Sequence, residues 1–270
     1  MSEDFKLERR GKCLEITLDR PPVHALNRKT SYALYDAFKM LQDDPDLAVA
    51  IVTATGTRAF SAGWDLKEVA AGSEESKPES IDLGPGGIGG LPEYFDLTKP
   101  VIAAVNGAAV GGGFEMILAA DILIAADHVE FFLPEMMRGF LPDAGAVQRI
   151  ARRLPYNVAM DLMLTGRRMS AHEAKHWGLV RDVVPAAELM TKAREVADLI
   201  AEGAPLALQA LKEVMARFSE VTVRESFALT HAAWRGESDL VLYEKMLRSE
   251  DYSEGPRAFA EKRKPVWKGR

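Results

Sequence analysis

Residues 101–115 read VIAAVNGAAVGGGFE, and this stretch decides the fold. Its first part, Val101 to Val105, is a continuous apolar run, which is typical of a strand covered on both faces. Three successive glycines, Gly111 to Gly113, then let the backbone turn closely and open a helix that we expect to continue to about Ala120. The stretch therefore predicts a buried strand, a small-residue turn and a helix.

Other strands follow from the same kind of pattern. Residues 49–53 and 122–126 are further continuous apolar runs, which predict strands buried on both faces. Residues 14–18 alternate apolar and polar side chains and predict a half-buried strand. Short apolar strands that alternate with helices indicate an α/β core with parallel pairing.

The predicted helices lie beside and after this core. A helical pattern covers about residues 29–41, with Tyr32, Leu34, Phe38 and Leu41 on roughly one side. From about Tyr156 onward the pattern is almost entirely helical. We therefore predict a core over residues 1–200 and a helical region over residues 201–270. The clearest helices of the last third are residues 188–200, 205–218 and 223–234.

Two turns rich in small residues leave the ends of apolar strands. Residues 60–67 follow the strand at 49–53, and residues 106–115 follow the strand at 101–105. In α/β proteins sites gather at such ends. Free backbone amides collect at the helix start that the Gly111 to Gly113 run opens, and they suit an oxygen that becomes negative during a reaction. A glycine-rich turn with an acidic residue that only complements the helix dipole explains this segment equally well.

Two carboxylates are candidates for acid–base chemistry. Glu115 lies in the first turn of the predicted helix, and Glu135 follows an aromatic stretch that ends at Pro134. Apolar surroundings raise the pKa of a carboxyl group, which suits a general acid or base. Taken alone, Glu135 fits a surface glutamate at a strand end better.

Composition and charge exclude several classes of protein. The net charge is -6 and the basic residues form no stripe, which argues against nucleic-acid binding. The single cysteine, Cys13, excludes an internal disulfide and predicts a buried structural thiol. The acidic N-terminus is followed by no apolar stretch of signal-peptide length, and no run of about 18 apolar residues occurs. We expect a cytoplasmic enzyme with no membrane span.

Two segments match known motifs in letters only. Residues 84–89 match the dinucleotide-binding fingerprint, but a polar loop precedes them where that fingerprint needs a strand. The loop over residues 71–90 is predicted to be a mobile surface loop. Residues 172–176 match the zinc protease motif, yet Ser170 with Glu173 forms a capping box and Gly178 stops the helix. A short capped surface helix is the better interpretation.

Together, these segments resemble the crotonase (enoyl-CoA hydratase/isomerase) superfamily over nearly the whole chain. One motif alone would be weak, whereas so many in the same order are specific. The matching segments are residues 14–21, 61–67, 100–115, 134–135, 163–166, 174–180 and 259–263.

The resemblance implies a spiral of ββα units and a C-terminal helical trimerisation region, in a homotrimer or a dimer of trimers. It implies reversible hydration of an α,β-unsaturated acyl-CoA thioester, with no metal or other cofactor. The amides of Trp64 and Gly112 would form the oxyanion hole, and Glu115 and Glu135 would be the catalytic pair. The remaining implied residues concern CoA: Ala62, Asp65, Leu66 and Lys67 would line its path, and Phe259 and Lys262 would reach the CoA of a neighbouring subunit.

Details of the chain narrow the resemblance. Three details resemble one branch of the family, whose substrate has an acyl chain that ends in trimethylammonium. They are Trp64, the loop at residues 84–87 and the tail at residues 265–270. His24 stands where the family usually has asparagine, and the sequence offers no account of it. Asp143 stands where many hydratases have glycine and some isomerases of the superfamily have a catalytic aspartate. It is either a third carboxylate of the site or the N-cap of a helix that starts at Ala144. An enoyl-CoA isomerase and a catalytically idle scaffold therefore remain alternatives.

Overall fold

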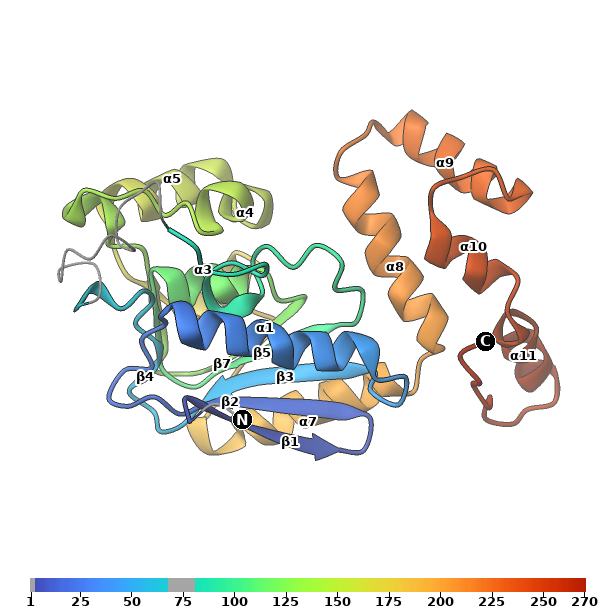
Figure 1. The fold of residues 1–270 in the computed structure, drawn as a ribbon, viewed down its shortest axis with the longest axis horizontal. Helices are drawn as coiled ribbons and strands as arrows, with labels where there is room; N and C mark the ends of the chain where they lie inside the picture. The colour runs from blue at the N-terminus through green and yellow to red at the C-terminus, as the bar shows by residue number, and fades with distance from the viewer. Residues whose placement is uncertain (1–2, 68–80) are drawn as a thin grey trace.

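Two sheets form the centre of the molecule (Figure 1). The computed structural model describes residues 3–67 and 81–270. The larger sheet has the order β1-β2-β3-β5-β7-β10, with parallel pairing throughout except between β1 and β2. Its strands are β1 Phe5–Arg10, β2 Cys13–Leu18, β3 Val49–Ala54, β5 Val101–Val105, β7 Ile122–Ala126 and β10 Asp182–Val184.

The smaller sheet has the order β4-β6-β8-β9, in which only the β8–β9 pair is antiparallel. Its strands are β4 Ala59–Ser61, β6 Ala108–Val110, β8 Glu130–Phe132 and β9 Met169–Ser170. Along the chain β3 precedes β4, β5 precedes β6 and β7 precedes β8, so each pair places one strand in each sheet. The chain therefore winds as a spiral, which confirms the predicted ββα architecture.

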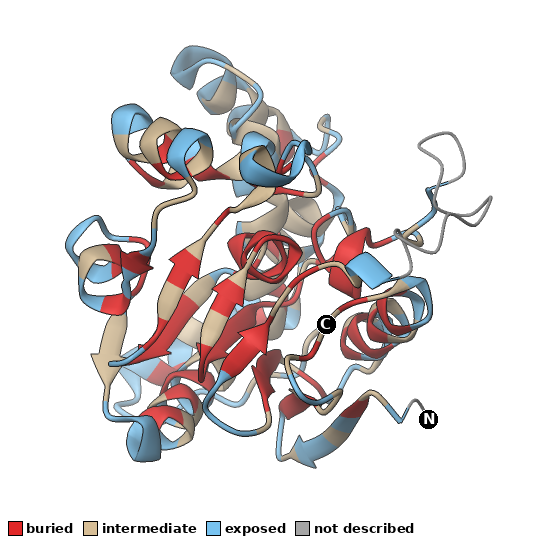
Figure 2. Cartoon of the chain, turned by 90° about the vertical axis from the view of Figure 1, so that its left-hand side faces the viewer, coloured by how far each residue is buried: buried red, intermediate tan, exposed pale blue. Residues whose placement is uncertain are grey.

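Helices surround the sheets and make up nearly all of the C-terminal third, as predicted. Figure 2 shows the buried residues concentrated in the strands and in the helix surfaces that face them. The helices are α1 Arg28–Asp43, η3 Ile88–Gly90, α3 Gly112–Leu118, η4 Glu135–Arg138, α4 Ala146–Arg153, α5 Tyr156–Thr165, α6 Ala171–His176, η5 Ala186–Glu188, α7 Leu189–Ala201, α8 Pro205–Phe218, α9 Val223–Arg235, α10 Val241–Leu247 and α11 Glu250–Ala260.

Two predictions about burial are wrong. Strand β2 is almost fully buried rather than half-buried, because Arg194 of α7 donates two hydrogen bonds of 2.8 Å to Glu15 and covers the polar face. Tyr32 does not share the buried side of α1 with Leu34, since it is exposed and its hydroxyl donates to Asp82. The burial of Glu15 therefore depends on a partner distant in sequence.

The predicted surface loop is also partly wrong. Residues 71–80 lie outside the described residues, but Gly86 to Pro92 are buried between α1 and α3. A Cβ on Gly90 would lie 2.2 Å from the backbone nitrogen of Tyr35, so only glycine allows this approach. The dinucleotide interpretation of residues 84–89 requires a strand before the motif, and the described residues 81–83 that lead into it form none.

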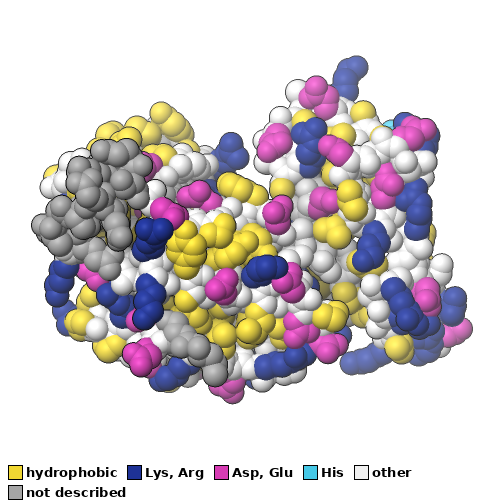
Figure 3. All heavy atoms as spheres, viewed as in Figure 1, with side chains coloured by type: hydrophobic (Ala, Val, Ile, Leu, Met, Phe, Trp, Pro, Cys, Tyr) yellow, Lys and Arg dark blue, Asp and Glu magenta, His cyan; other side chains and the backbone are white. Residues whose placement is uncertain are grey.

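In the described residues no helix could span a membrane, and the face drawn in Figure 3 carries no basic stripe. Within residues 3–67 and 81–270, each helix is too short or too polar to cross a bilayer. On the face drawn in Figure 3, acidic and basic side chains are interspersed. Cys13 is buried, as predicted, and burial raises the pKa of its thiol to about 12.

Candidate active site

Two glycine-containing turns meet at the ends of the strands of the smaller sheet. Gly63 follows β4, and Gly111 to Gly113 follow β6. A Cβ on Gly63 would lie 2.6 Å from the backbone nitrogen of Gly112, and one on Gly113 would lie 2.5 Å from the carbonyl oxygen of Ser61. Gly63 also has a φ of 79°. Glycine is therefore required at both positions for the two turns to pack as one unit.

The backbone amides of Trp64 and Gly112 face the space beside these turns. Gly63 and Asp65 make the two hydrogen bonds of the bridge between Trp64 and Leu26, so the N–H of Trp64 itself is directed away from Leu26. Gly112 begins α3, where the first amides have no partner inside the helix. Among the described residues neither amide has a hydrogen-bond partner in the protein.

Glu115 is buried in the first turn of α3, with only 3% of its surface exposed. Its Oε1 accepts a 3.1 Å hydrogen bond from the backbone N–H of Ala146. Burial is the main cause that raises its pKa to about 7, and the nearby charges of Glu135 and Asp143 act in the same direction. A group with such a pKa can both give and take a proton near neutral pH.

Glu135 is the first residue of η4 and lies against the glycine turn. A Cβ on Gly111 would lie 2.3 Å from Oε1 of Glu135, and the φ of Gly111 is 52°. The Oε2 atom of Glu135 is buried and has no hydrogen-bond partner in the described part of the chain. Burial raises the pKa of this carboxyl group as well. The interpretation of Glu135 as an ordinary surface glutamate is therefore wrong.

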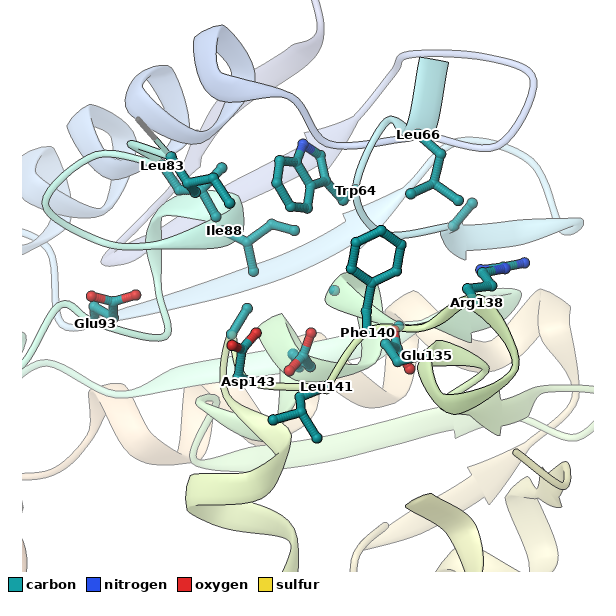
Figure 4. A pocket seen from close by; sticks show the side chains of 16 residues that line it. Trp64, Leu66, Leu83, Ile88, Glu93, Glu135, Arg138, Phe140, Leu141 and Asp143 are labelled. Carbon is teal, nitrogen blue, oxygen red and sulfur yellow. The ribbon is translucent and has the colours of Figure 1, made fainter. Parts of the chain in front are cut away.

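A cavity of about 360 Å³ brings these groups together. Figure 4 shows Trp64, Leu83 and Ile88 on one side of it, and Asp143, Leu141 and Glu135 on the other. The residues that line the cavity are Ala62, Trp64, Leu66, Ile81, Leu83, Ile88, Glu93, Gly111, Gly112, Glu115, Glu135, Arg138, Phe140, Leu141, Asp143 and Ala144.

Asp143 lines this cavity and is not a helix cap. Helix α4 has Gly145 at its N-cap, with no side-chain capping bond. The backbone N–H of Ala146 goes to Glu115 instead. The capping alternative for Asp143 is therefore wrong, and Glu115 is tied to the start of α4 rather than only complementing the dipole of its own helix.

The predicted CoA residues do not all lie together. Ala62 and Leu66 line the cavity, whereas the Asp65 carboxylate is held by Arg20 at 2.8 Å, and Lys67 is exposed. Phe259 and Lys262 lie at the end of α11, which Figure 1 places on the opposite side of the molecule from α4 and α5. These last two residues do not contribute to the cavity of their own chain.

Sequence reasoning missed several residues of the cavity. Ile88 comes from the segment assigned to a surface loop. Arg138 is the last residue of η4, and Phe140 and Leu141 follow it. Glu93 places a fourth carboxylate at the end of the cavity opposite Arg138 (Figure 4). No motif marks Glu93, because its neighbours belong to the cavity only through the packing of η3 on α1 and α3.

The segment that resembles a zinc motif is a short helix, α6, as predicted. Ser170 caps it and accepts a 3.1 Å hydrogen bond from the Glu173 N–H. The second half of the predicted capping box does not form, because the Glu173 carboxylate is held by Arg167. Across residues 3–67 and 81–270, no three His, Cys, Asp or Glu side chains are arranged to hold a metal.

The buried Glu115 carboxyl should make stability depend on pH. Its raised pKa means that the folded state binds this proton more tightly, so its stabilising contribution is complete below about pH 4.5 and is lost as the pH rises through about 7. We expect Glu115→Gln to be more stable than the wild type at pH 8 by on the order of 1–3 kcal/mol. That advantage should disappear at pH 4.5. Urea unfolding at both pH values measures it, and an equal advantage at both would contradict a buried charge.

Comparison with known proteins shows the family of this chain. The profile of the enoyl-CoA hydratase/isomerase family matches residues 8–270. The chain therefore belongs to the enoyl-CoA hydratase/isomerase family, which confirms the predicted crotonase membership. The carnitinyl-CoA dehydratases of Salmonella agona and Salmonella typhi are each 51% identical to it over 270 residues, which is 100% of this chain and of each relative.

Solved structures agree in fold. The crystal structure of enoyl-CoA hydratase from Mycobacterium tuberculosis H37Rv has a TM-score of 0.86 and 34% identity, and the match covers 100% of both chains. The enoyl-CoA hydratase from Bacillus anthracis has a TM-score of 0.89 and 33% identity over 99% of this chain and 100% of that chain. Both the sequence match and the structural similarity therefore show the crotonase fold.

Proposed function

We propose that this protein is a hydro-lyase that reversibly hydrates an α,β-unsaturated acyl-CoA thioester, with crotonobetainyl-CoA and carnitinyl-CoA as its substrate pair. The observation that carries the reaction type is the meeting of two amides without a partner among the described residues, Trp64 and Gly112, with two glutamates at one cavity. Glu115 is buried, and Oε2 of the half-buried Glu135 is out of contact with solvent. The acyl group is supported by the relatives at 51% identity, which are named carnitinyl-CoA dehydratase.

In the hydration direction, the thioester carbonyl oxygen lies between the amides of Trp64 and Gly112. These donors stabilise the enolate that forms when water adds to the β carbon. Glu115 holds the water and takes its proton, and Glu135 delivers a proton to the α carbon. Dehydration reverses the steps: Glu135 removes the α proton and Glu115 assists the leaving hydroxide. Only water and protons are transferred, so the proposed reaction needs no cofactor besides the CoA of the substrate.

The charge of the cavity fits a cationic acyl end. A trimethylammonium group donates no hydrogen bonds, so aromatic faces and negative charges are what hold it. Trp64 supplies an aromatic ring, and Asp143 and Glu93 add carboxylates to those of the catalytic pair. In Figure 4 Glu93 and Asp143 lie toward the end of the cavity that is far from Arg138. We propose that the acyl chain points to this end and that CoA leaves past Ala62 and Leu66.

Asp143 also supports a second candidate function, that of an enoyl-CoA isomerase. A third carboxylate in the cavity would let a proton move between two carbons of an enoyl-CoA. Labelled water separates the two reactions. We expect mass spectrometry of the product formed from crotonobetainyl-CoA in H₂¹⁸O to show one ¹⁸O atom. A product without ¹⁸O would favour isomerisation, and no turnover of any enoyl-CoA would favour the idle scaffold.

We further propose that residues 201–270 assemble the chain into a trimer or a dimer of trimers. In the single chain several large side chains of this region are mostly exposed, among them Leu211 at 59%, Phe227 at 62% and Trp234 at 61%. Apolar surface of this kind is costly in water and suits a symmetric interface. In such an assembly Phe259, which is 86% exposed, and Lys262 would be free to reach the CoA of a neighbour.

Light scattering tests this assembly. We expect a mass of three or six chains, because burying the exposed side chains of α8 and α9 favours association. The double change Phe227→Asp with Trp234→Asp should shift the mass toward one chain. Met40→Asp, a change at a large exposed side chain of α1, is the matched control and should leave the mass unchanged. A fully active wild-type monomer would contradict the assembly.

A further inference from the structure

A short segment, residues 23–26, lies against the turn that carries the Trp64 amide. The N–H of Ala62 donates to the carbonyl of Val23 at 2.9 Å, and the N–H of Leu26 donates to the carbonyl of Gly63 at 2.7 Å. The N–H of Asp65 donates to the carbonyl of Leu26 at 2.8 Å. These three hydrogen bonds alternate along the turn. They leave the N–H of Trp64, between two of them, directed to the cavity.

His24 holds this segment in place through both ring nitrogens. Nδ1 accepts a 3.1 Å hydrogen bond from the N–H of Arg20, so the ring proton is on Nε2, which lies 3.0 Å from the carbonyl oxygen of Thr55. Arg20 follows β2 and Thr55 follows β3, so the imidazole ties the segment to the ends of two buried strands. The side chain itself is only 4% exposed.

The backbone of His24 is also unusual. Its φ of 50° lies in the left-handed region, which costs a residue with a Cβ on the order of 1 kcal/mol. In this conformation its carbonyl oxygen accepts a 2.7 Å hydrogen bond from the Ser61 hydroxyl. The same hydroxyl oxygen accepts the N–H of Gly63 at 3.1 Å. The strained residue is thus linked directly to the turn before Trp64.

We propose that His24 is a positioning residue that sets the direction of the Trp64 amide in the oxyanion hole. The inference rests on the proposed function, because it assigns this amide to the thioester carbonyl. Asparagine has an oxygen near the place of Nδ1 and adopts the left-handed conformation readily. It therefore retains the link to Arg20 and preserves the segment in part, whereas glycine relieves the strain but removes both ring contacts.

Three variants and one spectroscopic signal test the proposal. The probe is butyryl-CoA labelled with ¹³C at the carbonyl, which has no double bond to hydrate and whose carbonyl stretch falls in frequency when amides donate to it. We compare the wild type with His24→Gly, His24→Asn and Ser61→Ala by isotope-edited infrared spectroscopy of the bound thioester. His128→Gly is the matched control, since Nε2 of His128 lies 2.9 Å from the carbonyl of Thr57 but has no link to the turn.

We expect the wild type and His128→Gly to show the full downshift of the carbonyl stretch. His24→Gly and Ser61→Ala should lose most of this downshift. Their kcat should be about tenfold lower, with KM within threefold of the wild type. Complete loss of one oxyanion-hole donor lowers kcat by about 10²–10³, and a misdirected donor should cause part of that loss. His24→Asn should recover most of the downshift and of kcat.

A full downshift with unchanged kcat in His24→Gly, together with a lower melting temperature, would mean that His24 only stabilises the fold and would overturn the proposal. Should His24→Gly fail to fold, an unchanged downshift in Ser61→Ala would overturn it equally. The absence of any downshift in the wild type would instead refute the oxyanion hole of the proposed function.

Discussion

Glu115→Gln and Glu135→Gln should each lower kcat by about a hundredfold or more, the usual loss when a general acid or base is removed. Each substitution is nearly isosteric and keeps an oxygen where Glu115 accepts the Ala146 N–H, so the fold should persist. Burial raises the pKa of both carboxyl groups, which suits proton transfer near neutral pH, and the amide of glutamine cannot transfer a proton there. Steady-state rates with crotonyl-CoA or crotonobetainyl-CoA measure the loss.

Glu130→Gln is the matched control for this experiment. Glu130 is a glutamate of the neighbouring strand β8 that pairs with Arg168 and does not line the cavity. Its substitution should leave kcat within about twofold, as is usual for surface changes. Near-normal turnover in both Glu115→Gln and Glu135→Gln, with circular dichroism unchanged, would show that the catalytic pair is misassigned.

Crotonobetainyl-CoA should be hydrated with a kcat/KM about thirtyfold higher than that of crotonyl-CoA. A cation–π contact with Trp64 contributes roughly 0.5–2 kcal/mol, and carboxylates in a partly dry site add attraction. A total of about 2 kcal/mol corresponds to that ratio. The two thioesters share the reacting carbons and differ only in the trimethylammonium group. Parallel specificity constants at one ionic strength measure it.

Removing the carboxylates at one end of the cavity should narrow this ratio. Asp143→Asn and Glu93→Gln each abolish a negative charge that faces the cavity. Each should lower kcat/KM for crotonobetainyl-CoA several-fold and leave that for crotonyl-CoA nearly unchanged, because the neutral chain has no charge to pair. Asp127→Asn, on the surface, is the control. Equal kcat/KM values for the two thioesters in the wild type would contradict a betaine substrate and would leave the family membership unaffected.

The sequence alone predicted the parts of the fold that depend on local pattern. The apolar runs at β3, β5 and β7 have no polar face, so they predicted strands covered on both sides. The helices α7, α8 and α9 follow from their periodicity to within a residue or two at each end. The glycines before Glu115 predicted a close approach of backbone because only glycine permits it.

Other features depend on contacts between segments distant along the chain, and only the tertiary structure decided them. Glu15 is buried because Arg194, from a helix 179 residues later, pairs with it. The loop before Glu93 is buried because it packs between two helices, and that packing brings Glu93 to the cavity. His24, which no motif explained, is accounted for by two ring contacts.

The candidate site divides in the same way. The resemblance of the sequence to the family predicted site roles for Glu115, Glu135, Trp64 and Gly112. The raised pKa of Glu115 depends instead on the packing that removes its carboxylate from water. Asp143 illustrates the limit: its sequence context fits a cap and a site residue equally. The Ala146 amide that it would have capped is bound by Glu115, a contact across 31 residues that no local pattern encodes.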